Sequence, residues 1–159
     1  MPTALLTGTR PNLGAAAATL GRAGFDVLTW PVGSPAVPAD GPFDCYVQLP
    51  CAAGEGSDAL ICRIDTLAAV ADRLGPNASI LLAVDEPEPP AAPRPGTLAP
   101  DLLAAVALAL LEDIGRPATR LAVVPVTSLC RPAAEPAPLD SLVGAGQWEM
   151  PTPPLVSAP

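Results

Sequence analysis

Hydrophobic residues in this chain occur in short runs that are separated by stretches rich in glycine and proline. Strands that are buried on both faces of a sheet read as continuous apolar runs of this kind. Such runs predict five strands, at residues 3–7, 26–30, 43–49, 79–84 and 119–126. Between the strands, the three- and four-residue spacing of apolar side chains predicts helices over residues 14–23, 57–74 and 100–114.

The segment 57–74 has the clearest helical pattern. Ser57 or Asp58 can cap its first turn, and Gly75 and Pro76 are expected to end it. Its inner face should consist of the apolar side chains that recur along one side, namely Leu60, Ile64, Leu67, Ala71 and Leu74.

The segment 100–114 is apolar on nearly every side. A helix that flanks a sheet needs only one apolar stripe, so its second face has to be covered by another surface. Two coverings are open from the sequence: the proline-rich C-terminal residues folding back, or a subunit interface.

Strands that alternate with helices predict a parallel sheet, because crossovers between parallel strands are right-handed. The expected fold class is α/β, a small doubly wound, Rossmann-like parallel sheet of about five strands. Proline-rich loops interrupt the pattern at 31–42 and 85–96. We expect a Rossmann-like domain over 1–127 and a proline-rich tail over 128–159 that packs on this domain or on a partner, with a short strand around residues 147–148.

The length of 159 residues suits one domain. No apolar run reaches the roughly 18 residues that a membrane span requires, and the N-terminus lacks a signal-peptide pattern, so we expect a cytoplasmic protein that does not enter a membrane. The net charge of −8, with eight arginines scattered along the chain, argues against nucleic acid as a partner.

The chain has no histidine and no lysine. It therefore lacks the usual general base at neutral pH, the Schiff-base amine and the P-loop lysine. Arginine stays protonated and does not replace them in proton transfer. The cysteines lack the spacing of metal ligands and have no histidine beside them, so no metal site is expected and buried free thiols are predicted at Cys45, Cys51, Cys62 and Cys130.

The turn TGTRPNLG, at residues 7–14, is the first candidate site. A helix N-terminus offers free amides and a favourable dipole to a phosphate. The residues of this turn that could bind a cofactor are Gly8, Arg10, Asn12, Leu13 and Gly14. Against this, Asn12 brings a side chain to a place where the backbone should approach a pyrophosphate, and Trp30 and Pro31 end the second strand where an acid would bind the ribose hydroxyls.

Asp85 and Glu86 form the second candidate site, because they follow a central strand and open α/β sheets bind ligands at the carboxyl ends of their strands. Paired carboxylates there are suited to acid–base catalysis. A solvated loop is the alternative interpretation of the same residues.

The order of the elements resembles the short-chain dehydrogenase/reductase family, in shortened and degenerate form, over residues 3–127. TGTRPNLG is similar to the glycine motif TGxxxGxG of that family, with Asn12 in place of the middle glycine. VQLPCAAG stands where the family has NNAG, and SILLAVDEP resembles the strand that delivers its catalytic serine. LLAAVALALLEDIGRPATRLAVVPV resembles the helix that carries Tyr-x-x-x-Lys, together with the strand that follows it.

The mechanism of that family needs a tyrosine hydroxyl and a lysine one helical turn away. Here the only tyrosine, Tyr46, lies in the middle of a predicted strand, and no lysine exists. The resemblance therefore implies a chain without the catalytic set, and no bound nicotinamide dinucleotide is expected. Members of the family assemble through the helices that match 57–74 and 100–114.

The leading hypothesis from the sequence is a non-catalytic subunit that acts as a structural or regulatory partner, in a homodimer or in a hetero-oligomer with a full-length reductase. One alternative is a small-ligand or nucleotide sensor that uses the crevice beside TGTRPNLG. Another is an enzyme, such as a cyclase or isomerase, with Asp85 or Glu86 as its base.

Overall fold

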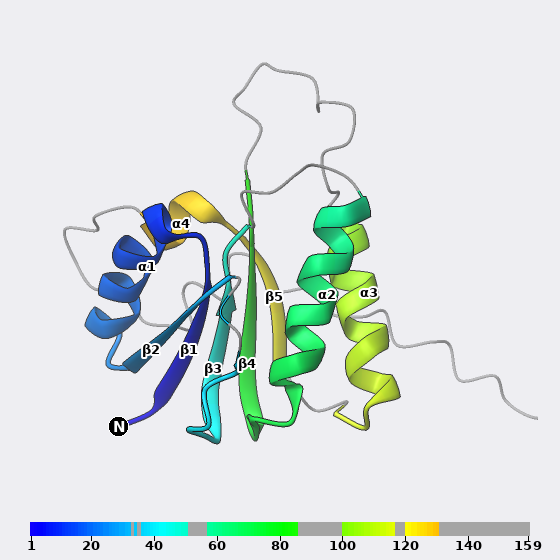
Figure 1. Cartoon of the computed structure of the whole chain (residues 1–159), viewed down its shortest axis with the longest axis horizontal. Helices are drawn as coiled ribbons and strands as arrows, with labels where there is room; N and C mark the ends of the chain where they lie inside the picture. The colour runs from blue at the N-terminus through cyan, green and yellow to red at the C-terminus, as the bar shows by residue number, and fades with distance from the viewer. Residues whose placement is uncertain (33, 35, 51–56, 86–99, 117–119, 131–159) are drawn as a thin grey trace, which may run out of the picture.

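The computed structural model describes residues 1–32, 34, 36–50, 57–85, 100–116 and 120–130. Its strands form one five-stranded parallel sheet, which confirms the predicted small Rossmann-like α/β fold (Figure 1). In spatial order the strands are β2 (Asp26–Pro31), β1 (Thr3–Gly8), β3 (Phe43–Gln48), β4 (Leu74–Val84) and β5 (Arg120–Pro125).

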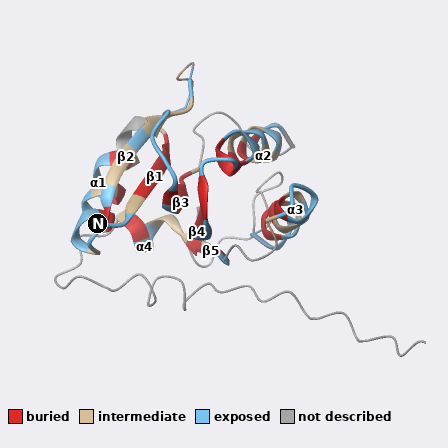
Figure 2. Ribbon diagram, turned by 90° about the horizontal axis from the view of Figure 1, so that it is seen from below, coloured by how far each residue is buried: buried red, intermediate tan, exposed pale blue. Residues whose placement is uncertain are grey.

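The helices lie on both faces of the sheet because the chain changes direction at β1. It moves outward in one direction from β1 to β2, and in the opposite direction from β3 to β5. Right-handed crossovers therefore place α1 (Arg10–Arg22) on one face, and α2 (Ser57–Ala71) and α3 (Pro100–Asp113) on the other (Figure 2). The short α4 (Val126–Cys130) contacts α1. The change of direction between β1 and β3 is the place where open α/β sheets bind ligands, at the carboxyl ends of the strands.

An apolar layer lies on each side of the sheet, because successive strand residues point to opposite faces. Leu6 and Val47 belong to the layer beneath α1 and α4, together with Leu13, Leu20, Leu49 and Leu129. Leu5 and Tyr46 belong to the layer beneath α2 and α3, together with Leu67, Ile80, Leu103 and Leu111. Trp30 and Val37 pack against this second layer.

Several boundaries differ from the expectation. α1 begins at Arg10 rather than at residue 14, since Pro11 suits the first turn of a helix, where no amide donor is needed. α2 ends at Ala71, and Gly75 and Pro76 belong to β4, next to an irregularity in its pairing with β3. A proline without an amide donor is tolerated at such an irregular strand end.

The inner face of α2 is also shifted from the predicted one. Ala59, Arg63 and Val70 are buried, whereas Leu60 and Ile64 are half-buried. Leu67, Ala71 and Leu74 are buried, as predicted. The buried stripe therefore differs from the predicted one only in the first half of the helix, where it runs through Ala59 and Arg63 instead of Leu60 and Ile64.

α4 spans the boundary that was expected at residue 127, so the regular structure continues to Cys130. The predicted strand around residues 147–148 lies outside the described residues. Within the described ranges, no helix is long and apolar enough to cross a membrane.

Candidate functional site

The candidate cofactor turn is closed from both sides by backbone hydrogen bonds at the end of β1. The amide of Leu49 donates to the carbonyl of Thr7 at 2.8 Å, and the amide of Val32 donates to the carbonyl of Gly8 at 3.1 Å. The Leu49 side chain lies against Gly8, since a Cβ built on Gly8 would be 2.6 Å from the Cβ of Leu49. Real Cβ atoms do not approach this closely, so packing by itself requires a glycine at position 8.

The first turn of α1 presents fewer free amides than a phosphate-binding helix does. Position 11 is a proline and has no N–H, and the Asn12 amide donates to the carbonyl of Thr9 at 3.3 Å. Thr9, the N-cap residue, makes no side-chain capping bond. Gly14 lies on the exposed side of α1, where a Cβ would meet nothing within 4 Å. Neither the space around Gly14 nor the amides of this turn therefore requires a pyrophosphate.

Apolar side chains from three segments fill the layer behind this turn. Leu13 of α1, Leu49 after β3 and Leu129 of α4 are all buried in it. The Cys130 thiol also approaches the carbonyl of Asn12, with Sγ 3.9 Å from the oxygen. α4 therefore joins the first turn of α1 to the end of β5, and Leu13, one of the predicted cofactor residues, is a core residue.

The predicted site residues thus have different surroundings. Gly8 lies beneath Leu49, Leu13 is in the core, Asn12 is half-buried beside Cys130, and Gly14 is exposed. The side chain of Arg10 lies outside the described residues. The packing of the turn accounts for Gly8 and Leu13 without a ligand, whereas nothing in the packing requires a glycine at position 14.

Of the two candidate carboxylates, the structure describes Asp85 alone. Asp85 is exposed directly after β4, and Glu86 lies outside the described residues. A carboxylate that acts as a general base usually lies in an enclosed cleft, whereas the Asp85 side chain is exposed. Across the described ranges, no group of three or more His, Cys, Asp and Glu side chains is arranged to hold a metal ion.

A buried polar network lies at the carboxyl ends of β1 and β3, on the face covered by α2. The hydroxyls of Thr7 and Tyr46 share a hydrogen bond of 3.0 Å, and Nε2 of Gln48 donates to the Tyr46 hydroxyl at 3.0 Å. Arg63 of α2 is 3% exposed. Its Nε donates to Oε1 of Gln48 at 2.9 Å, and its Nη2 donates to the Gln48 carbonyl at 3.1 Å.

The same amide of Gln48 also donates from Nε2 to the carbonyl of Arg63, at 2.9 Å. The two residues therefore bond to each other through both side chains and both carbonyls. This arrangement attaches α2 to the end of β3 and satisfies the amide of Gln48 in the interior, where an unmade bond would be costly. It also assigns the only tyrosine a structural role, because the Tyr46 hydroxyl is engaged within the core.

Tyr46 is a core residue, as its place in a predicted strand indicates, whereas its hydrogen-bond partners are not predicted from the sequence. Two signals were present: Arg63 lies three residues after Leu60 and four before Leu67, and Thr7 and Gln48 are polar residues in apolar strands. These positions place all three side chains on buried faces. A buried Arg63 is nevertheless not expected from the sequence, because arginine side chains are usually exposed.

Trp30 lies next to Thr7 in the pairing of β2 with β1. Its indole Nε1–H is buried and has no acceptor among the described residues. The end of β2, where a ribose-binding acid would stand in a dinucleotide site, is therefore occupied by a half-buried aromatic side chain.

Cys45 is a buried free thiol, as predicted, whereas Cys62 and Cys130 are half-buried rather than buried. Cys51 lies outside the described residues. Burial, with a smaller contribution from the Asp44 carboxylate, raises the pKa of Cys45 to about 12. Burial also raises the pKa of Cys130. Because the thiolate is the nucleophile, neither side chain has the properties of a reactive cysteine.

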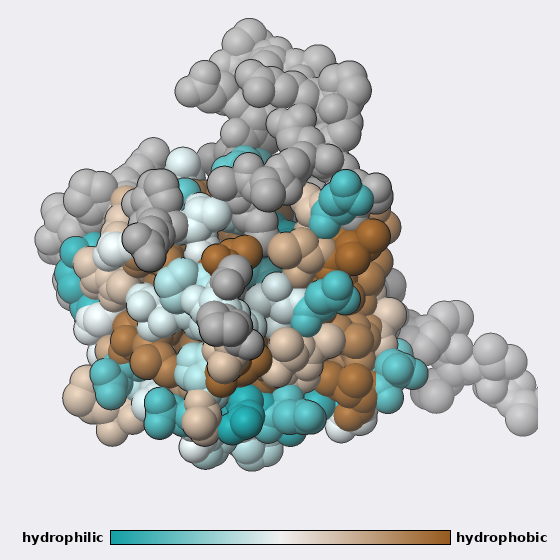
Figure 3. Space-filling model, in the orientation of Figure 1, coloured by the Kyte–Doolittle hydropathy of each residue, from teal (hydrophilic) through white to brown (hydrophobic). Residues whose placement is uncertain are grey.

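The α2–α3 outer face, defined as the exposed residues of α2 and α3, carries the large exposed apolar side chains of the described helices. Ile61 is 57% exposed and Leu102 is 49% exposed, each in the part of its helix nearest the carboxyl edge of the sheet. Ala105 and Ala109 continue the exposed side of α3. Figure 3 shows hydrophobic residues gathered over this side of the molecule, with hydrophilic residues beside them.

No family model matches the chain, and no curated protein matches it. The resemblance to the short-chain dehydrogenase/reductase family therefore stays a prediction from the residues quoted above. The assignment of a Rossmann-like fold rests on the order of the strands and on their parallel direction.

Proposed function

We propose that this chain is a non-catalytic assembly subunit, a Rossmann-like scaffold that binds another protein through the α2–α3 outer face. The observation that carries the proposal is the exposure of Leu102 and Ile61 on two adjacent helices. Large apolar side chains gathered on one exposed surface are typical of protein-binding sites.

The carboxyl edge of the sheet supports the same proposal. The place where a Rossmann-like fold binds its cofactor is packed with Leu13, Leu49 and Leu129, and the catalytic set that the resemblance would require is missing from the sequence. The described residues at the carboxyl edge are therefore better explained as a structural region, which favours the helical face as the functional surface.

A pair of variants tests the proposal in the full chain. Leu102→Asp places a charge on the α2–α3 outer face, and Val32→Asp makes the same kind of change at an apolar residue after β2 that is 43% exposed. Leu102 is in the first turn of α3, where an acid is compatible with the helix dipole, so the variant should fold.

In extracts of the source cell, the wild-type chain and Val32→Asp should elute in a complex larger than the chain alone. Leu102→Asp should elute as a folded monomer, with its circular dichroism spectrum unchanged. Wild-type protein that elutes as a monomer, or a complex that survives Leu102→Asp, would contradict the proposal.

A further inference from the structure

The charges around the α2–α3 outer face all have the same sign. Asp58, Asp65 and Asp72 recur every seven residues along the exposed side of α2 and just beyond its end. On α3 the exposed charges are Asp101, Glu112 and Asp113. The one cation within the two helices is Arg63, and it is buried against β3.

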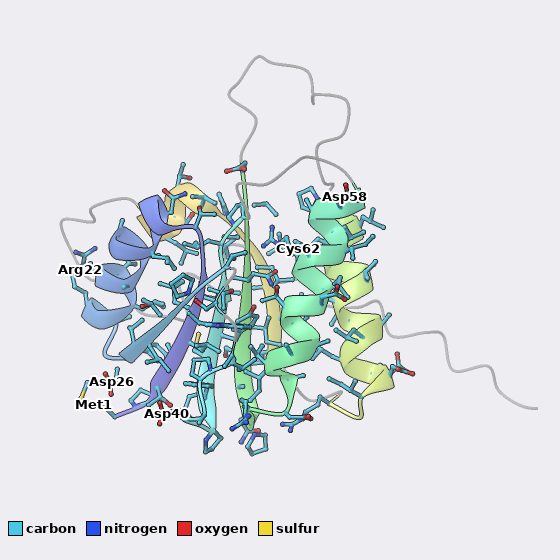
Figure 4. The ribbon with its side chains drawn as sticks, viewed as in Figure 1. Met1, Arg22, Asp26, Asp40, Asp58 and Cys62 are labelled. Carbon is cyan, nitrogen blue, oxygen red and sulfur yellow. The ribbon has the colours of Figure 1, made fainter. Side chains whose placement is uncertain are left out.

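The arginines that flank these helices do not neutralise the face. Arg73 donates to the carbonyl of Ala39 at 2.9 Å, and Arg116 donates to the carbonyl of Leu74, the first residue of β4, at 2.6 Å, so the guanidinium groups of both residues are bonded to the backbone. Arg22, on α1, lies on the opposite side of the molecule from Asp58 (Figure 4). The apolar side chains of the face are thus bordered by carboxylates.

We propose, building on the proposed function, that the occupant of this face is an amphipathic helix of a different protein, with arginine or lysine residues beside its apolar stripe. A second copy of this chain fits poorly, because a two-fold interface brings the same surface of both copies together and would oppose carboxylates with carboxylates. The C-terminal residues 131–159 fit poorly for the same reason, since they contain one arginine and three acids.

The spacing of the carboxylates indicates a helix as the partner. Seven residues of helix span about 10.5 Å, so Asp58 and Asp65 lie two turns apart on one side of α2, and Asp72 follows just beyond the end of the helix. A partner helix that lies along α2 and carries cations at the same seven-residue spacing can face each of them, as oppositely charged residues do beside the apolar seam of a coiled coil. Its apolar stripe would then contact Ile61 and Leu102.

Photo-crosslinking of the full chain in its source cell tests this inference. A photoreactive residue replaces Leu102 in one version and Val32 in the control, and mass spectrometry maps the crosslinked segment. We expect position 102, but not position 32, to crosslink to another protein, within a segment that carries several arginine or lysine residues next to apolar ones.

The outcomes separate the two proposals. A crosslink to this chain itself, either in a second copy or within residues 131–159, would overturn the inference and leave an interaction surface in place. A crosslink to a neutral or acidic segment of another protein would likewise overturn the inference about a basic helix, while still supporting an interaction surface at this face. No crosslink at position 102 above the level at position 32 would contradict the proposed function as well.

The affinity for the crosslinked partner gives a second test. Asp65→Asn/Asp72→Asn removes two carboxylates of the face, and Asp26→Asn/Asp40→Asn makes the same change in net charge at exposed positions far from it (Figure 4). We expect the first pair to weaken binding roughly threefold to thirtyfold and to reduce its dependence on salt, because surface ion pairs contribute little individually and are screened. Equal effects of the two pairs would overturn the inference.

Discussion

Leu49 lies so close to Gly8 that no other residue fits at position 8 without a shift of the backbone. A Cβ on Gly8 would be 2.6 Å from the Leu49 Cβ, and the Leu49 amide is hydrogen-bonded to the neighbouring Thr7 carbonyl. The glycine that most resembles part of a cofactor motif is thus required by contact between β1 and the residue after β3. A glycine motif can persist in a Rossmann-like chain for reasons of packing alone.

Gly8→Ala and Gly14→Ala should have opposite effects on stability. The first forces a methyl group against the Leu49 side chain and should lower the free energy of unfolding by about 1–3 kcal/mol. The second adds a methyl group in open space on a helix and should raise it by about 0.5–1 kcal/mol. Urea denaturation of both variants measures this. Destabilisation by Gly14→Ala equal to that of Gly8→Ala would show that position 14 also needs a glycine.

The bonds between Gln48 and Arg63 should appear as a coupling energy. Gln48→Met removes an acceptor from a buried guanidinium and should cost about 2–3 kcal/mol. Arg63→Met should cost a similar amount, and the double variant about 1–3 kcal/mol less than the sum of the two single variants. Arg73→Met serves as the control. Arg73 is exposed and its guanidinium donates to the carbonyl of Ala39, so this variant should cost less than about 1 kcal/mol. Additive single effects would contradict the network.

Alkaline pH should destabilise the protein through Cys45. Its pKa is 9.0 for an ordinary thiol and about 12 in the folded chain, so between these values the unfolded state loses a proton that the folded state retains. The free energy of unfolding should therefore fall as pH rises from 9 to 12, by up to about 1.4 kcal/mol per pH unit from this group. Below pH 9 the Cys45 thiol is protonated in both the folded and the unfolded state, so its contribution to the free energy of unfolding is fully present.

Cys45→Ala isolates that contribution. The variant should have a shallower decline of stability above pH 9 than the wild type, measured by urea denaturation at several pH values. An identical alkaline decline in both proteins would show that Cys45 is not the group responsible.

Nicotinamide dinucleotides should not stabilise the chain. A ligand that binds the folded state and is present at 100 times its dissociation constant adds about 2.7 kcal/mol to the free energy of unfolding. Thermal unfolding with millimolar oxidised or reduced dinucleotide should therefore superimpose on unfolding without it. A clear rise in Tm would favour the sensor hypothesis instead.

The strands were predictable from the sequence to within one or two residues for β1, β2, β3 and β5, because each is a short run of mainly apolar residues. The start of α1 was not predictable in this way, because the predicted turn extends to Gly14 whereas Pro11 already lies in the helix. α4 was missed because five residues are too few to show a helical period.

The candidate site was harder to predict than the fold. The contact of Leu49 with Gly8, and the bonds of Arg63 with Gln48, join residues that are 15 or more positions apart, so no local pattern reveals them. The apolar character of the exposed side of α3 was predictable. The helix is apolar on nearly every side, and the sheet can cover only one of those sides.

Native mass spectrometry of the full chain, taken from its source cell without denaturation, tests the central claim most directly. The chain alone has a mass of 16.0 kDa. Our account predicts a complex that is heavier by a second, different polypeptide, and that the chain released from it carries no additional mass. A 16.0 kDa chain that carries only the mass of a nucleotide or another small molecule would contradict the account.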